Sequence, residues 1–312
     1  MRLLLILCAL TTSILAQPED KPWPGQLRNR TSLPKIIASK ADSAPFTYES
    51  LSFRFISDKK LDLNKVREFA KTAESVPAVV SRIPLPLLHM PVTADGKKPA
   101  IYIFSDPESY ARAGGSPQSA GYYSGRQKAV YLRASAFTEV KVGRTVRYNL
   151  LVHELTHLCN DGILGYVPPW FSEGNAEYIS AAFIPKGSYQ FTSITDRIML
   201  HAKRQLQKQK HIRAPELEKF LQLSSKDWRE LTSTMEPNEI YHLYCLSLML
   251  VHHFYHRDPD GRTIAKQYIE ACQNRKKSSA PYPSLLTSKE AKALEKSLLA
   301  YWKPKGITIN FE

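Results

Sequence analysis

The sequence contains 312 residues, of which 43% are hydrophobic and 23% are charged. Those fractions are typical of a globular protein and exclude general disorder, while the length fits one large domain or two closely packed ones. Lys and Arg outnumber Asp and Glu by 43 to 29, and the resulting net charge of +14 raises the question of an anionic partner such as nucleic acid, an acidic polymer or a membrane surface.

The first 16 residues predict a secretory signal peptide. Arg2 gives a positive start, a short apolar run follows, and the small residue Ala16 precedes Gln17, which is the order found in such leaders. The apolar run is too short for a membrane span of ~20 residues, although an uncleaved anchor is the alternative. Cleavage would remove Cys8 and leave three cysteines, too few for a disulfide scaffold. We therefore expect a secreted or periplasmic protein with no membrane span after cleavage.

The rest of the chain divides into three parts by pattern. Residues 17–45 contain five prolines and no apolar periodicity, a composition typical of an extended tether. Residues 46–135 alternate strand and helix patterns and are expected to form a mixed α/β subdomain. Residues 136–312 are dominated by helical patterns, so the predicted fold class is α+β, with the two subdomains forming one continuous unit.

Local patterns place the elements of both subdomains. In the first, residues 51–56 alternate apolar and polar side chains, and 101–104 and 129–132 are short apolar runs, so all three are predicted strands. Helices are expected after the capping residues Asp62 and Asp106. Helical periodicity in the second subdomain predicts helices over residues 145–159, 169–183, 192–209, 216–223, 239–255, 262–272 and 288–302.

The helix over 145–159 carries the sequence HELTH, with His153 and His157 four positions apart. That spacing puts both imidazoles on one helical face, where they can reach one Zn²⁺ at ~2.0–2.1 Å. Glu154 is then placed to take a proton from water at the metal. Glu154 is also the single charged residue between positions 149 and 160, which indicates a buried helix rather than a solvated one.

A catalytic zinc usually has three protein ligands, so a third one is needed. The metzincin pattern requires Gly and His where this chain has Asn160 and Ile163, and that branch is excluded. Glu173 follows His157 by sixteen positions, after two consecutive prolines that can start a new helix. A helix folded back against the first would deliver Glu173 to the metal.

The stretch HELTH followed by WFSEGNAEY resembles the gluzincin metallopeptidases of the peptidase MA-like clan, which includes thermolysin and a group of zinc aminopeptidases. In those aminopeptidases the third ligand is the Glu of a Trp-x-x-Glu-Gly-x-Ala-x-Tyr stretch, which corresponds to Glu173 here. The resemblance implies a zincin-like fold and a Zn²⁺ cofactor. The sequence has no counterpart of the Gly-x-Met-Glu-Asn motif with which the aminopeptidases bind substrate amines, so aminopeptidase activity is not implied.

The run from about residue 46 is also similar to a family of secreted bacterial peptidase-like domains whose substrates are largely unassigned. Those domains share an N-terminal α/β layer and a Ser-Ala-Gly-Tyr-Tyr-Ser-like turn, seen here at 119–124. Tyr244 resembles in position the gluzincin tyrosine that donates its hydroxyl hydrogen to the oxyanion. Tyr241, three positions earlier, is a second candidate for this role. The alternative is that either tyrosine is simply a residue of the hydrophobic core.

Three further features leave alternatives open. Glu177 shares a helix face with Glu173 and could orient a ligand histidine by accepting its hydrogen bond; a solvated glutamate is the other interpretation. His252 and His256 also have i, i+4 spacing, but no acid directly follows His252, and partly exposed helix histidines are favoured over a second metal site. Cys159 is expected to be a buried core residue rather than a thiolate ligand.

Together these residues predict zinc-dependent hydrolysis of amide bonds in a peptide or protein substrate, with a cell-wall amide also open. The strand over 129–132 is expected to line the cleft and pair with an extended substrate. A non-catalytic zinc-stabilised binding or scaffold protein and a polyanion-binding secreted protein are the rival hypotheses. No specific nucleic-acid partner is expected, because residues 148–185 contain no Lys or Arg and four acids.

Overall fold

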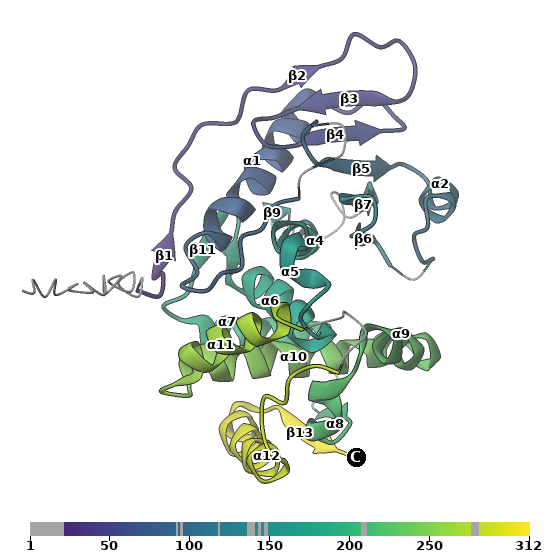
Figure 1. The fold of residues 1–312 in the computed structure, drawn as a ribbon. Helices are drawn as coiled ribbons and strands as arrows, with labels where there is room; N and C mark the ends of the chain where they lie inside the picture. The colour runs from purple at the N-terminus through teal and green to yellow at the C-terminus, as the bar shows by residue number, and fades with distance from the viewer. Residues whose placement is uncertain are drawn as a thin grey trace, which may run out of the picture.

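The computed structural model describes residues 22–91, 93, 96–117, 119–135, 141–142, 145–146, 149–206, 211–275 and 281–312. The predicted signal peptide lies outside these residues. Helices and strands are both present, which confirms a mixed α and β structure (Figure 1). Within the described part of the chain, no helix is both long enough and apolar enough to cross a membrane.

A six-stranded mixed sheet forms the first half of the molecule. Its order is β2 (Ile37–Ala38), β3 (Phe46–Glu49), β4 (Arg54–Ser57), β5 (Ala100–Phe104), β7 (Ala129–Arg133) and β6 (Gly121–Ser124). The central strands β4, β5 and β7 are parallel, and β6 returns antiparallel to β7. The crossover from β4 to β5 contains α1 (Leu63–Val80), and α2 (Pro107–Arg112) follows β5. Asp62 and Asp106 cap these two helices with their side chains.

The two faces of this sheet have different surroundings, as the period-2 alternation of strand side chains requires. Ile101 and Val130 point into the main core against the helices. On the other face, Tyr131 stacks on Tyr102 at a ring-centroid distance of 4.9 Å and on Tyr122 at 4.7 Å. The aromatic face is covered in part by α2, whereas the aliphatic face carries the helical half of the protein.

The strand predicted to pair with substrate, 129–132, is β7, and it cannot do so. Its backbone is hydrogen-bonded to β5 on one side and to β6 on the other, so neither of its edges is free. Among the described strands of this sheet, β6 is the edge next to β7. The strand that can accept an added chain on this side is therefore β6.

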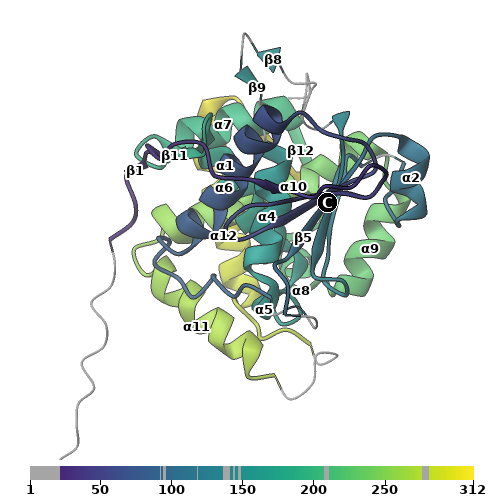
Figure 2. The same ribbon diagram turned by 90° about the horizontal axis from the view of Figure 1, so that it is seen from above.

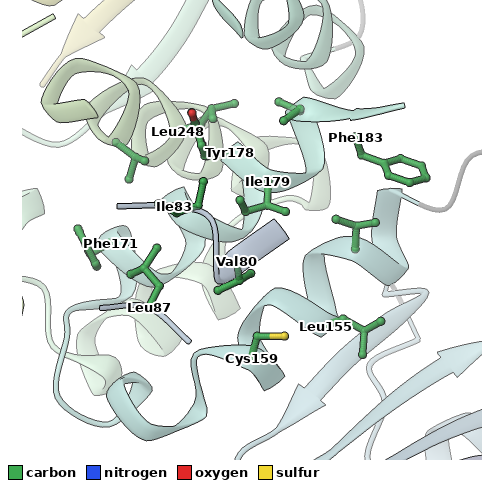
Figure 3. Packing of buried hydrophobic residues seen from close by; sticks show 14 of the residues in the cluster. Val80, Ile83, Leu87, Leu155, Cys159, Phe171, Tyr178, Ile179, Phe183 and Leu248 are labelled. Atoms are coloured by element: carbon green, nitrogen blue, oxygen red, sulfur yellow. The ribbon is translucent and has the colours of Figure 1, made fainter. Parts of the chain in front are cut away.

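Three helices stack in succession on one face of the sheet, and Figure 3 shows buried residues from each of them, among them Leu155, Tyr178 and Leu248. The helix α4 (Asn149–Cys159) contacts β6 and β7, and α6 (Pro169–Ala182) packs on α4. The helix α10 (Pro237–His256) packs on the far side of α6. A Cβ added at Gly174 would lie 2.5 Å from the carbonyl oxygen of Ser247, so glycine is what allows α6 to approach α10 so closely.

The remaining elements lie outside this stack, and Figure 2 shows many of them from above. They are α5 (Asp161–Leu164), α7 (Ile194–Gln205), α8 (Leu217–Gln222), α9 (Ser225–Thr234), α11 (Gly261–Gln273), α12 (Ser288–Trp302), the 3₁₀ turn Lys303–Lys305 and the short strands β8 (Lys141–Val142), β9 (Thr145–Val146), β10 (Phe183–Ile184), β11 (Ser188–Gln190), β12 (His211–Ala214) and β13 (Thr308–Phe311). The expected helix over 145–159 begins at Asn149. The helix α9 was not among the sequence-based predictions.

Residues 22–45, which we call the N-terminal strap, are anchored rather than free. Its strand β1 (Gln26–Leu27) pairs with β11, and β2 pairs with β3. The indole N–H of Trp23 donates a hydrogen bond of 2.8 Å to the Tyr178 hydroxyl on α6. This part of the expected tether is therefore extended between fixed points, because two strand pairings and the partly buried ring of Trp23 hold it to the body.

Candidate metal centre

The helix α4 presents its two histidines side by side. The Nε2 atoms of His153 and His157 are 3.1 Å apart, and the rings are edge-on with an interplanar angle of 79°. Both side chains are largely buried, because α4 lies between the sheet and α6. One face of α4 thus directs two imidazole nitrogens at a single point.

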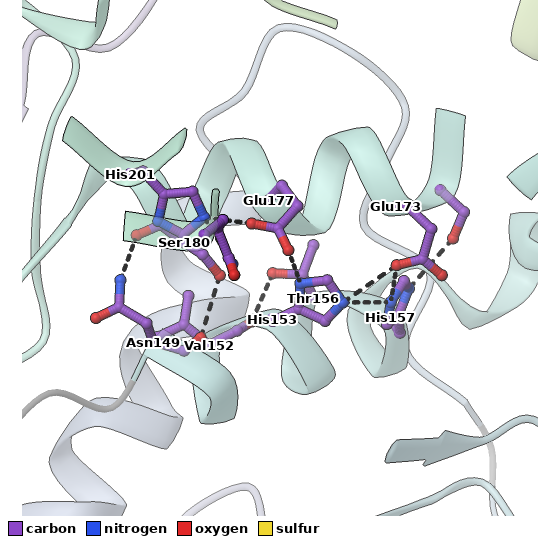
Figure 4. Close-up of polar contacts among 11 residues, drawn as sticks. Asn149, Val152, His153, Thr156, His157, Glu173, Glu177, Ser180 and His201 are labelled. Atoms are coloured by element: carbon purple, nitrogen blue, oxygen red, sulfur yellow. Dashed lines mark hydrogen bonds and ion pairs between the residues drawn. The ribbon is translucent and has the colours of Figure 1, made fainter. Parts of the chain in front are cut away.

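The third donor comes from α6. Glu173 Oε2 lies 3.2 Å from His153 Nε2 and 3.4 Å from His157 Nε2 (Figure 4). Pro168 is in extended conformation and Pro169 begins α6, so the chain turns back onto α4 as the sequence suggested. We call His153, His157 and Glu173 the donor triad; among the residues that the structure describes, they are the group placed to hold a metal ion.

The donor triad has the spacing that a tetrahedral zinc ion requires. Around Zn²⁺ with bonds of ~2.0–2.1 Å, the ligand atoms of a tetrahedron are ~3.3–3.4 Å apart. The three donor-to-donor distances of 3.1, 3.2 and 3.4 Å fall close to that value. Two imidazole nitrogens and one carboxylate oxygen are also a donor set found in catalytic zinc sites. The three residues therefore fit a divalent metal ion such as Zn²⁺.

Each histidine of the donor triad is oriented by a second contact at its other nitrogen. His153 Nδ1 lies 3.3 Å from Glu177 Oε1, and His157 Nδ1 lies 3.2 Å from the Ser172 hydroxyl oxygen. Both partners are on α6. A proton on Nδ1 leaves the Nε2 lone pair of each ring directed at the metal position, which fixes the tautomer needed for coordination.

Glu177 has a second partner that sequence reasoning missed. Its Oε2 contacts Nε2 of His201, a buried residue of α7 (Figure 4). His201 lies within a predicted helix, but no spacing or motif in the sequence relates it to Glu177. Packing of α7 against α6 creates the contact, so local patterns could not have revealed it.

Electrostatics around the donor triad favour a cation. Burial disfavours a charged His153, but hydrogen bonds to Glu173 and Glu177 outweigh it and raise its pKa well above the ordinary value. Burial also opposes the charge of Glu173, yet the neighbouring His157 and His153 lower its pKa to about 2. Burial likewise opposes the charge of Glu177, but His201 and His153 lower its pKa. Both glutamates therefore stay ionised and create a strongly anionic environment in which positive charge is stabilised.

Glu154 differs from the other two glutamates. It is 6% exposed, and burial raises its pKa while the charges of His153 and His157 oppose that rise. A hydrogen bond from the backbone of Tyr123, on the edge strand β6, also favours its ionised form. A carboxyl group with a raised pKa beside a metal site is suited to accepting and returning a proton.

The donor triad opens into a cleft. A cavity of about 870 Å³ is lined by Glu154 and the donor triad on one wall and by Tyr123, Trp228 and Tyr244 on the others. A second cavity of about 600 Å³ continues past Glu154 towards Glu177 and His201. Cavities of this size match those that hold small-molecule or peptide ligands.

The structure brings the predicted Tyr244 to this cleft. Its ring centroid is 6.2 Å from that of His153, and the residue lines both cavities. Burial raises the pKa of its hydroxyl well above the ordinary value, with further contributions from Glu173 and Glu154, so it remains a hydrogen-bond donor. Tyr241 lines the second cavity, one helical turn away.

The other candidate residues lie elsewhere. His252 is only 1% exposed, which corrects the expectation of a partly exposed helix histidine. Its Nε2 lies 3.0 Å from the Thr195 hydroxyl, and His256 Nε2 lies 2.8 Å from that of Tyr178. Cys159 is a buried free thiol, as expected, and its pKa is raised by burial.

No protein-family model matches this chain, and no curated protein is significantly similar to it in sequence.

Proposed function

We propose that this protein is a secreted zinc metallopeptidase of the gluzincin type, with a zincin-like fold, that hydrolyses amide bonds in peptides. The observation that carries the proposal is the donor triad, whose three atoms lie 3.1–3.4 Å apart at the wall of a cleft beside Glu154. The predicted leader supports export to the periplasm or the medium.

His153, His157 and Glu173 would hold the metal, and Glu177 and Ser172 would keep the two rings in the coordinating tautomer. Bound Zn²⁺ would supply Lewis acidity and lower the pKa of water towards ~7. The Glu154 carboxylate accepts the proton from the attacking water and returns it to the leaving amine nitrogen. The Tyr244 hydroxyl donates a hydrogen bond to the carbonyl oxygen as charge develops on it.

Substrate would lie along the edge strand β6. That strand carries Tyr122 and Tyr123, and Gly121 and Tyr123 line the 870 Å³ cavity. An extended peptide added at this edge would gain main-chain hydrogen bonds and pass Glu154, which the backbone of Tyr123 contacts. This replaces the earlier expectation that the strand over 129–132 receives the substrate.

The substitution Glu154→Gln tests the assignment. We expect the purified protein to keep one zinc per chain while hydrolysis of a pooled fluorogenic peptide library falls by ~10²–10⁴, the range for loss of a general base. Metal content is measured by atomic absorption and turnover by fluorescence. Glu173→Ala is the companion variant, and it should lose the zinc itself.

A wild-type protein that binds zinc but hydrolyses no peptide would support the rival hypothesis of a zinc-stabilised binding protein. Equal turnover in wild type and Glu154→Gln would contradict the role of Glu154.

A further inference from the structure

Three cavities meet around Tyr244 and Ser116, which line all of them. The cavity of 870 Å³ contains the donor triad, and the one of 600 Å³ extends towards α7. The third, of about 480 Å³, lies against α9 and is lined by Thr232, Ser233 and Arg229 of that helix. The cleft therefore has an α7 end and an α9 end, on either side of Tyr244.

The two ends differ in charge. The protein contains 43 Lys and Arg residues, yet Arg229 is the single one among the described residues that line the three cavities. The carboxylates of the cleft are Glu154, Glu173 and Glu177. Glu173 and Glu177 are engaged with histidines, and Glu154 serves the reaction. A substrate therefore meets one unengaged charge, at the α9 end.

Arg229 is exposed and makes no ion pair with any residue described by the structure. Its helix is nevertheless firmly placed. Ser224 and Asp227 form a reciprocal capping box at the start of α9, and the largely buried Trp228 stacks on Tyr244 at a centroid distance of 6.1 Å. The backbone that carries Arg229 is thus fixed relative to the donor triad.

The two hydroxyls of α9 that line this cavity do not compete for an anion. Thr232 donates its hydroxyl hydrogen to the Trp228 carbonyl oxygen, and Ser233 donates to that of Glu230. They can accept hydrogen bonds but have no hydrogen left to offer. The guanidinium of Arg229, with five N–H donors in a planar fork, is the group at this end that matches a carboxylate.

We infer that Arg229 determines specificity by binding a substrate carboxylate, so that the cleft prefers peptides carrying an acidic group on the α9 side of the scissile bond. The inference rests on the proposed peptidase function for the reaction, although the binding preference can be measured without turnover. The carboxylate is either an Asp or Glu side chain or the carboxyl terminus of the peptide.

The test uses equilibrium binding to the Glu154→Gln protein, in which cleavage is expected to be ~10²–10⁴-fold slower and so does not deplete the peptide during the measurement. The probes are dye-labelled octapeptides with amidated ends, in which one Glu, Gln or Lys is scanned through a neutral sequence. We expect the best Glu peptide to bind about fivefold tighter than its Gln counterpart, the size typical of a partly exposed ion pair. A matching set with a free carboxyl terminus distinguishes the two sources of the carboxylate.

In the Glu154→Gln protein, adding Arg229→Ala should bring the ratio of the affinities for the Glu and Gln peptides to about one. Adding Arg229→Glu instead should make the Lys peptide the tightest binder. Lys226→Glu is the matched control, because Lys226 lies on the same helix, is exposed and lines none of the three cavities; it should leave the ratio unchanged.

A Glu-to-Gln ratio that survives Arg229→Ala, or a wild-type preference for Gln or Lys peptides, would overturn the inference. The two proposals fail separately. If the Arg229-dependent preference is found but the wild-type protein cleaves neither peptide, the peptidase proposal is contradicted and the carboxylate site stands.

Discussion

Two helices of this protein carry histidines at i and i+4, and only one pair has the surroundings of a metal site. His153 and His157 on α4 meet Glu173 and Glu177 within 3.2–3.4 Å. On α10, the Nε2 atoms of His252 and His256 are instead bonded to the hydroxyls of Thr195 and Tyr178, and aromatic rings surround them. Identical spacing thus has different consequences, because the neighbouring helix supplies carboxylates in one case and not in the other.

The pKa values of the histidines on α4 and α10 differ in the same way. Glutamate contacts raise the pKa of His153 well above its ordinary value. Burial lowers the pKa of His252 to about 3 and that of His256 to about 4. A site with a high histidine pKa attracts positive charge, whether proton or metal, and the α10 pair excludes it. The helix spacing alone therefore does not define a metal site.

The largest effect should come from removing one histidine of each pair. His157→Ala deletes a ligand of the donor triad, and we expect zinc affinity to fall by more than the ~10–100-fold seen for outer contacts. His256→Ala, the matched variant, should leave affinity unchanged. Competition with a fluorescent chelator measures both. An equal loss in the two variants would mean that the two pairs are not functionally distinct.

A smaller effect is expected from Glu177→Gln. The variant keeps the shape of the side chain but weakens the contact that orients His153, so zinc affinity should fall ~10–100-fold. Glu295→Gln is the control, because Glu295 is also buried but accepts its hydrogen bond from the Leu217 N–H, in another part of the molecule. Retained affinity in Glu177→Gln would show that the donor triad does not depend on that carboxylate.

The smallest effect concerns the histidine pair of α10 and the loss of folding stability at low pH. Because the pKa of His256 is about 4 in the folded protein and ~6.5 when unfolded, the unfolded chain binds more protons between those values. Neutral His256 therefore contributes fully to the free energy of unfolding above about pH 6.5, and this contribution is lost as the pH falls towards 4. The slope for one such group approaches ~1.4 kcal/mol per pH unit.

Urea unfolding between pH 7.5 and 4.5 measures this slope. His256→Gln retains a hydrogen-bonding side chain but cannot titrate, so its stability should depend less on pH than that of the wild type. Parallel pH profiles for the two proteins would refute a neutral, half-buried His256.

The sequence predicts all three residues of the donor triad, and the reason is local. His153, Glu154 and His157 are close in the chain, so helical periodicity alone places them, and two prolines mark the helix that brings Glu173 back. His201 and Arg229 lie on separate helices and reach the site only through packing of those helices, which no local pattern records.

Three other differences between the sequence-based predictions and the structure also have identifiable causes. The helix α9 is short and has a single buried residue, Trp228, so its sequence offers few apolar positions by which to identify it; its other signal is the capping box at Ser224. The strand β7 is internal because β6 folds back outside it, and strand order is a tertiary property. The N-terminal strap lacks apolar periodicity because it is held at separate points rather than along one face.

The contact of Trp23 with α6 also has a kinetic consequence. Its hydrogen bond to Tyr178 spans 155 positions, and the Tyr178 hydroxyl in turn meets His256 at the end of α10. Contacts so distant in the chain close slowly, because the intervening loop loses its entropy first. The strap contact can close only when α6 and the end of α10 are in place to receive it, so we expect it to form late in folding although the strap comes first in the chain.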